Sequence, residues 1–162
     1  MVSLKSKKGF TIVELLIVIV VIGILATLVI VTFTGIQQKG RNSQRQTDVK
    51  AIQSQVEAFF AQHGFYPTLA DLQSATFVST YLKGLPPEAL KDPKGPTANI
   101  GGTTDSDNYS YVAEGPTGGT VTCDNAVANP LTGGEPVDNG CDAFTVSATL
   151  EGSTTPFTQQ SN

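Results

Sequence analysis

The sequence contains few of the residues that usually build catalytic and metal sites. It has two cysteines, Cys123 and Cys141, and a single histidine, His63, which together do not supply the four ligands of a tetrahedral zinc site. There is no serine triad, metal-ligand cluster or phosphate-binding glycine loop, because the glycine pairs at 101–102, 118–119 and 133–134 lie in polar segments without a strand-to-helix context. We therefore expect no catalytic residue, no metal and no cofactor, and a protein that is not an enzyme.

One short acidic segment has to be weighed against that expectation. Asp105, Ser106, Asp107 and Asn108 carry oxygens of the kind that bind calcium. The match is too short to predict a calcium site, so we favour a solvated turn before a strand and keep calcium binding as the alternative.

Positive charge is scarce in the second part of the chain. From Gly64 onward there are three lysines against eleven carboxylates, whereas residues 34–63 contain four basic and two acidic side chains. Proteins that bind nucleic acid need clustered lysine and arginine to contact phosphates. The acidic balance therefore argues against direct nucleic-acid binding by the part that follows Gly64.

Proline is absent before Pro67, and the run from Phe10 to Val31 has a single charge, Glu14. As a helix this run spans roughly 30 Å, the thickness of a bilayer's hydrocarbon core, and it is apolar on every side. A secretory signal peptide is disfavoured because the run is too long and no small-x-small cleavage site follows it. A plain membrane anchor leaves Glu14 unexplained.

Residues 34–63 also lack proline, but their apolar residues form a stripe. The stripe residues recur at spacings of three and four, which is typical of an amphipathic helix; they are Val49, Ile52, Val56 and Phe59. Residues 37–46 are polar on all faces. We predict one helix from Phe10 to about Gln62, with a transmembrane half over 10–33 and an amphipathic half over 34–63.

Two glycines interrupt this predicted helix. Gly35 and Gly40 each weaken a helix by about 1 kcal/mol relative to alanine. We therefore expect the helix to be less stable at these two positions, unless residues packed against it compensate for the loss.

Turn-forming residues divide the remainder of the chain into short elements. Gly64 and Pro67 end the long helix, and Leu85–Pro87 breaks the chain again. Between them, the capping-box spacing of Thr68 and Asp71 opens a short helix through about Tyr81.

Alternating apolar residues predict two strands of an antiparallel sheet, over 108–114 and 144–150, with Val121 in a candidate third strand. The tail, residues 152–162, is predicted to be disordered. The fold class is therefore α+β: a long N-terminal helix packed on a small antiparallel β-sheet head that covers residues 64–151.

The N-terminal run carries a specific resemblance. Residues 7–18, KKGFTIVELLIV, and the stretch on through Ala26 resemble the N-terminus of type IV pilins and the related pseudopilins. In that family a basic leader ends in Gly, a dedicated membrane peptidase cuts after it, and the new N-terminal Phe is methylated on its amine. The resemblance implies a leader over 1–9, cleavage between Gly9 and Phe10, and methylation of Phe10. The chain departs from many members at Val31, where they carry a proline.

The resemblance also implies a role in assembly for Glu14. A lone carboxylate in hydrocarbon is costly, so Glu14 must be neutral or paired. Cleavage creates a positive amine at Phe10, and in the family the Glu of an incoming subunit meets that amine on a neighbour. The alternative is a glutamate that reaches the lipid head groups without a role in assembly.

The two cysteines suit a disulfide in a small head outside the cell. A Cys123–Cys141 bond closes a loop of about 19 residues, worth roughly 3 kcal/mol on the chain-entropy model. Two unpaired thiols are the alternative.

Taken as a member of this family, the chain is expected to be a type IV pilin-like subunit of an extracellular filament that serves adhesion, motility or DNA uptake. Its expected partners are other pilin subunits, the prepilin peptidase, the assembly machinery and, before assembly, the membrane. The expected location is a single-pass membrane precursor and then a surface filament. One alternative is a pseudopilin of a type II secretion system. A more distant one is a membrane-tethered binding protein that does not polymerise.

Overall fold

The computed structural model describes residues 9–95, 100–103, 105–115, 123–124, 128–129, 131–132, 134–138 and 140–161. The predicted leader up to Lys8, the glycine pair 118–119, Gly133 and the candidate strand residue Val121 lie outside the described residues. The chain divides into two compact units, Met1–Lys39 and Gly40–Asn162, so that the boundary falls at one of the two glycines predicted to weaken the helix.

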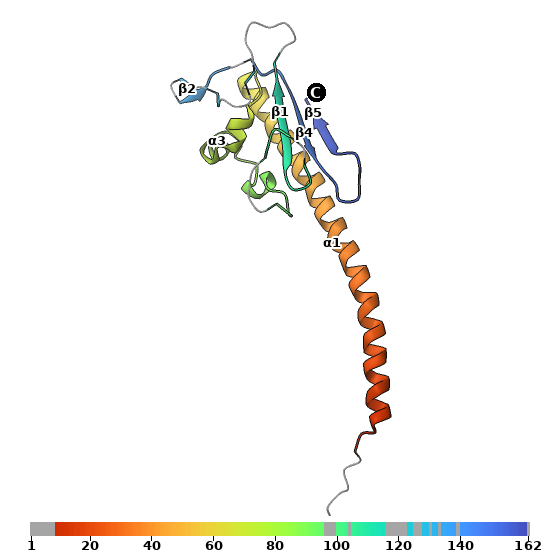
Figure 1. Cartoon of the computed structure of the whole chain (residues 1–162). Coiled ribbons are helices and arrows are strands. Elements are labelled where there is room, and N and C mark those ends of the chain that lie inside the picture. Colours follow the sequence, from red (N-terminus) through yellow and green to blue (C-terminus); the bar gives the residue numbers. More distant parts are fainter. Residues whose placement is uncertain are drawn as a thin grey trace, which may run out of the picture. The chain divides into compact units, whose positions relative to one another are not determined.

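Helix α1 runs from Ile12 to His63 and confirms the predicted long helix (Figure 1). It begins two residues later than predicted, because Thr11 takes the position that caps its N-terminus. Gly64 follows its last residue with a φ of 85°, and its N–H donates to the Phe60 carbonyl at 2.8 Å. Glycine adopts this left-handed conformation at little cost, which explains why the helix ends there.

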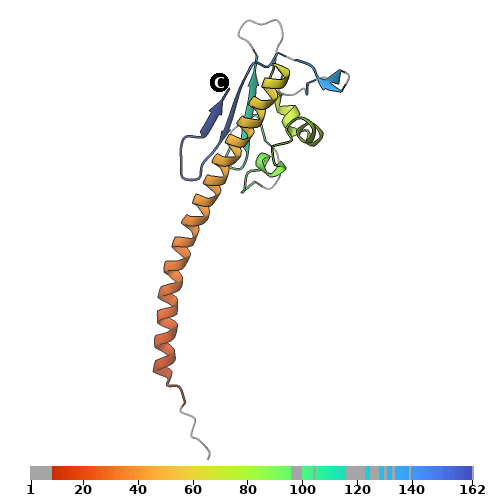
Figure 2. The same ribbon diagram turned by 180° about the vertical axis from the view of Figure 1, so that it is seen from behind.

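In the second unit, the amphipathic part of α1 buries its predicted stripe. Val49, Ile52, Val56 and Phe59 are at most 1% exposed. This part of α1 lies along one face of the three-stranded sheet in both views (Figures 1 and 2). Tyr111, Phe144 and Val146 belong to the same buried cluster, so the hydrophobic core lies between helix and sheet.

The sheet contains β1 (Tyr109–Glu114), β4 (Ala143–Ala148) and β5 (Phe157–Gln160), in the antiparallel order β1-β4-β5. Strands β1 and β4 confirm the two predicted strands. Their alternation places Tyr109, Tyr111 and Ala113 of β1 in the core.

The prediction of a disordered tail is wrong. Residues Phe157–Gln160 pair with the outer edge of β4, with Val146 opposite Gln159. The Gln53 side chain of α1 also donates to the Gln160 carbonyl at 2.9 Å. The head therefore extends beyond residue 151, because backbone pairing on an open strand edge orders a polar segment that has no apolar pattern of its own.

The predicted short helix is present but divided. Helix α2 (Leu69–Gln73) ends at Ser74, which is also the N-cap of α3 (Ala75–Tyr81) through a 3.3 Å bond from the Phe77 N–H to its hydroxyl. The capping box of Thr68 and Asp71 is confirmed.

Two further short elements complete the described part of the second unit. The 3-10 helix η1 (Pro87–Leu90) follows the predicted break at Leu85–Pro87. A two-stranded hairpin of β2 (Leu131–Thr132) and β3 (Glu135–Pro136) was not predicted, because strands of two residues leave no alternation to detect.

Candidate functional site

The predicted cleavage site lies just before the first turn of α1. Gly9 and Phe10 precede the helix and are exposed, Phe10 by 82%. A Cβ placed on Gly9 would have no atom within 4 Å, so its backbone is open to an approaching protein. Backbone without helical hydrogen bonds, next to a residue without a side chain, is a geometry that a peptidase can engage.

The side chain of Glu14 is hydrogen-bonded to Thr11 of its own chain. Its Oε2 atom accepts hydrogen bonds from the Thr11 N–H at 2.8 Å and from the Thr11 hydroxyl at 2.6 Å, while the Glu14 N–H donates to Thr11 Oγ1 at 3.2 Å. These reciprocal bonds form a capping box at the start of α1. The T-x-x-E spacing that signals it is present in the sequence at residues 11–14 and was overlooked.

The capping box changes the energetics of Glu14 within a single chain. Carboxylates are stabilised at helix N-termini, where unpaired N–H groups and the helix dipole meet them. Thr11 satisfies one carboxylate oxygen through two of the bonds named above. A partner supplied by another subunit therefore has to add to these bonds or replace them.

The first unit presents an apolar surface around the helix. The described large apolar side chains from Phe10 to Ile36 are between 48% and 87% exposed. By length and composition α1 qualifies as a candidate membrane span. Because exposed apolar area on this scale is unfavourable in water, this segment has to be covered by lipid or by other helices.

Arg45 lies within the polar stretch of residues 37–46, yet it does not face solvent. This side chain is fully buried, and it lies four residues before Val49, on the line of the apolar stripe. Its Nε and Nη2 atoms donate to the two carboxylate oxygens of Asp92 at 2.6 and 2.8 Å. Its Nη1 atom donates to Glu151 Oε1 at 3.1 Å. The spacing of Arg45 from Val49 is the sequence signal for its burial. A search for apolar periodicity does not detect it, because the residue is charged.

Together with Arg45, two further polar side chains of α1 hold the turn that follows β4. Arg41 donates to both oxygens of Glu151, at 2.6 and 2.7 Å. Asn42 bonds to the backbone of Glu151 in both directions, at 2.9 and 3.0 Å. The hydrogen bond from Arg41 lowers the pKa of Glu151 to about 2.

The cysteines lie at the other end of the sheet. The structure joins Cys123 and Cys141 in a disulfide, with 4.8 Å between their Cα atoms. The Cys141 carbonyl accepts the Tyr66 N–H at 2.7 Å, so the bridge is connected to the turn after α1. It ties the segment between β1 and β4 to the core.

The acidic segment considered for calcium forms a turn. Asp105 accepts from the Asp107 N–H at 2.9 Å and from the Asn108 side chain at 3.0 Å. Within the described residues no group of three potential metal ligands is found. The described part of this segment is a hydrogen-bonded turn before β1, and calcium binding by it stays untested.

Comparison with known proteins gives one family model, described as the prokaryotic N-terminal methylation motif, which matches residues 4–30. Among similar proteins, the type II secretion system core protein G of Dickeya chrysanthemi is 33% identical over 40% of this chain and 42% of its own length. The type IV major pilin protein PilA of Myxococcus xanthus is 36% identical over 40% of this chain and 29% of its own length.

A second core protein G, from Klebsiella michiganensis, is 31% identical over 56% of this chain and 61% of its own length. The chain thus spans less than two thirds of each of these relatives. No solved structure matches it significantly. The methylation motif, the relatives and the long N-terminal helix with a small antiparallel sheet all support the resemblance of this chain to type IV pilins and pseudopilins.

Proposed function

We propose that this chain is a structural filament subunit that is cleaved after Gly9, methylated on the Phe10 amine and assembled through the apolar part of α1. The observation that carries the proposal is the first part of α1, which is apolar on every side, begins two residues after Phe10 and contains one carboxylate, Glu14. Before assembly lipid covers this surface, and in the filament the same surface packs against other copies. Nothing in this role requires catalysis by the chain.

In the proposed assembly, Glu14 meets the Phe10 amine of a neighbouring subunit. The two charges are costly to bury separately and less costly together, so pairing favours subunits in register. The capping bonds from Thr11 use one carboxylate oxygen, Oε2. The second oxygen can accept from the amine without loss of the cap.

The test is the identity of the N-terminus in the natural host. Mass spectrometry of the subunit from membranes and from sheared filaments is expected to show a chain that starts at a methylated Phe10. A bulky residue at position 9, such as Gly9→Leu, is expected to leave unprocessed precursor in the membrane. A mature chain that begins at Met1, or beyond Ala26, would contradict the proposal.

A pseudopilin of a type II secretion system is the second candidate. It is favoured by the similarity to two proteins named type II secretion system core protein G. The disulfide is compatible with both candidates, because disulfides persist in the periplasm as well as on the cell surface. Deletion of the gene separates them: loss of surface filaments indicates a pilin, and loss of secreted proteins with filaments retained indicates a pseudopilin.

A further inference from the structure

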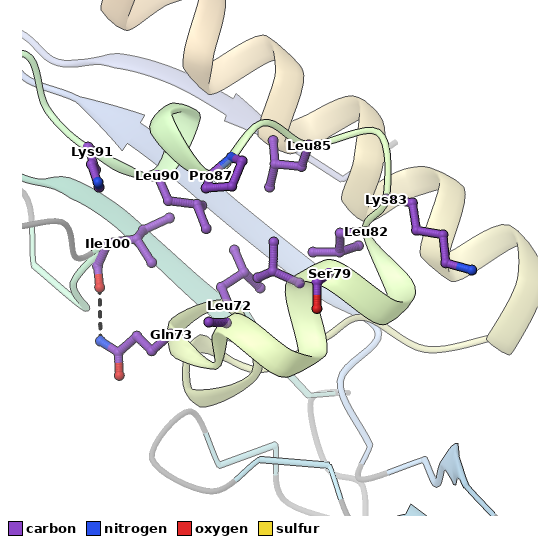
Figure 3. Close-up of a pocket in the computed structure, with 12 residues that line it drawn as sticks. Leu72, Gln73, Ser79, Leu82, Lys83, Leu85, Pro87, Leu90, Lys91 and Ile100 are labelled. Carbon is purple, nitrogen blue, oxygen red and sulfur yellow. Dashed lines mark hydrogen bonds between the residues drawn. The ribbon is translucent and has the colours of Figure 1, made fainter.

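A groove lies between α3 and η1 on the head (Figure 3). Its volume of about 580 Å³ is within the range of pockets that bury a drug-sized ligand. Apolar side chains from α2, α3, the 82–90 segment and the residues before β1 line it, chiefly Leu72, Val78, Leu82, Leu85, Leu90 and Ile100. We refer to it as the α3–η1 groove.

The charged side chains that line this groove are both lysines. Lys83 and Lys91 are exposed and lie toward opposite ends of it (Figure 3). They are two of the three lysines that the chain contains after Gly64, among eleven carboxylates. The groove is therefore an apolar, basic site on an acidic head, and its chemistry suits an apolar group flanked by carboxylates.

A segment with that chemistry is present on the same head. In the described residues from Gly40 onward, two large apolar side chains are exposed, Leu131 by 61% and Val137 by 39%. Both belong to the β2–β3 hairpin or directly follow it. Glu135 and Asp138, which flank Val137 closely in sequence, are also exposed. The hairpin is thus an apolar, acidic projection.

The hairpin cannot reach the groove of its own chain in this arrangement. In both views α3 lies between the hairpin and η1 (Figures 1 and 2). The hairpin is held on its own side of α3 by a hydrogen bond from the Tyr81 hydroxyl to the Gly134 carbonyl. Asp71 of α2 further binds the backbone and side chain of Asn129, at 3.0 and 2.5 Å.

We propose that the β2–β3 hairpin of one subunit docks into the α3–η1 groove of a second copy, with Leu131 and Val137 in the groove and Glu135 and Asp138 beside Lys83 and Lys91. Such a contact joins two different surfaces of identical chains, so it is heterologous and can continue as an open helical assembly. It also sets opposite charges against each other where heads of the same net charge meet, and like charges repel. The proposal rests on the proposed filament function.

The first experiment reverses the charges in the full-length chain and measures sheared filament against processed subunit in the membrane. K83E/K91E and E135K/D138K are each expected to lower filament yield roughly tenfold, which corresponds to about 1.4 kcal/mol at the interface. Combining all four changes restores the complementary charges and is expected to restore most of the yield. The control E114K/D142K changes the net charge as much as E135K/D138K but lies at the end of the sheet, in the last residue of β1 and the residue before β4, and is expected to assemble normally.

These variants separate docking from a general effect of charge. K83E/K91E makes the head more acidic and E135K/D138K makes it less acidic, so a net-charge effect would move the two yields in opposite directions. If either double variant assembles normally, or if the fourfold variant does not recover, the proposal is wrong. Loss of yield only in K83E/K91E would indicate that another ligand uses the groove, which also overturns it.

The second experiment uses wild-type protein, so its result does not depend on whether a variant folds. A carbodiimide joins an amine to a carboxylate in direct contact, and wild-type filaments treated with it are expected to give cross-linked dimers. Mass spectrometry of those dimers should identify peptides that join Lys83 or Lys91 to Glu135 or Asp138. Dimers cross-linked only elsewhere overturn the proposal. Wild-type cells that form no filament of this subunit contradict the proposed function instead, so the two failures are distinguishable.

Discussion

Arg45 and Asp92 form a two-bond ion pair inside the head, with Nε–Oδ2 and Nη2–Oδ1 distances of 2.6 and 2.8 Å and side-chain exposures of 0% and 2%. The pair connects α1 to the turn after η1, forty-seven residues later in the chain. Asp92 Oδ1 also accepts the Lys94 N–H at 2.8 Å. A buried pair of this kind stabilises the head only while both partners are present, because either charge alone is costly.

Arg45→Met is therefore expected to destabilise the head by about 3–5 kcal/mol, since it leaves the Asp92 carboxylate buried without a counter-charge. Adding Asp92→Asn is expected to recover part of this loss, because Asn keeps an oxygen for the Lys94 N–H and carries no charge. Arg41→Met is the control: its side chain is 30% exposed, and ion pairs at exposed sites contribute about 0–1 kcal/mol. Thermal unfolding of the detergent-solubilised chain measures all three. Equal losses for Arg45→Met and Arg41→Met would contradict this account.

Glu151 is expected to contribute to stability in a pH-dependent manner. The hydrogen bond from Arg41 lowers its pKa from an ordinary 4.5 to about 2 in the folded chain. A lowered pKa means that the ionised form favours folding, so the contribution is present above about pH 5 and is lost as the pH falls towards 2.

The measurement for Glu151 is the stability difference between the wild type and Glu151→Gln across that range. Comparing the two proteins removes the opposing effect of Asp71, whose pKa is raised by burial and whose protonation favours folding as the pH falls. We expect the difference to be largest near neutral pH and to vanish near pH 2. A difference that stays constant with pH would refute the role of this carboxylate.

Replacing Glu14 tests assembly separately from helix capping. Glu14→Ala is expected to insert into the membrane and to be cleaved after Gly9, because it removes a charge from the apolar run. It is expected to lose most filament, since the Phe10 amine of the neighbour is left without a partner.

The matched control for Glu14 is Thr11→Val, which removes the capping hydroxyl and keeps the backbone N–H bond to Glu14. Loss of an N-cap costs about 0.5–2 kcal/mol, so we expect this variant to be processed and assembled at near-normal levels. The ratio of sheared filament to processed subunit is the readout. If Thr11→Val loses as much filament as Glu14→Ala, the main role of Glu14 is to cap α1.

Removal of the disulfide is expected to weaken the head without changing its fold. The bond closes a segment with a sequence separation of 18, which corresponds to about 3 kcal/mol in the chain-entropy model. Cys123→Ala/Cys141→Ala is expected to lower the unfolding temperature by several degrees or more. Non-reducing peptide mapping of exported protein provides the direct check, and free thiols on that protein would contradict the bond.

Much of the fold is predictable because its signals are local. The apolar run up to Val31, the stripe from Val49 to Phe59 and the capping box of Thr68 and Asp71 depend on neighbours in the sequence, and the structure contains all three. The same holds for Gly9, Phe10 and Glu14, whose roles remain proposals but whose pattern is confined to a few adjacent residues. Local backbone geometry translates such spacings directly into structure.

The tertiary structure alone decided what involves distant partners. In the sequence Arg45 is one residue of a polar stretch, and only the fold brings Asp92 and Glu151 to it. The 157–160 segment reads as a disordered tail until the edge of β4 offers its backbone groups. The groove beside Lys83 and the exposed Leu131 can be recognised as two halves of a proposed contact only in the folded chain, where they lie on different sides of α3. Sequence patterns record what a residue does beside its neighbours, whereas burial of charge, strand pairing and surface complementarity depend on contacts that form only when the whole chain folds.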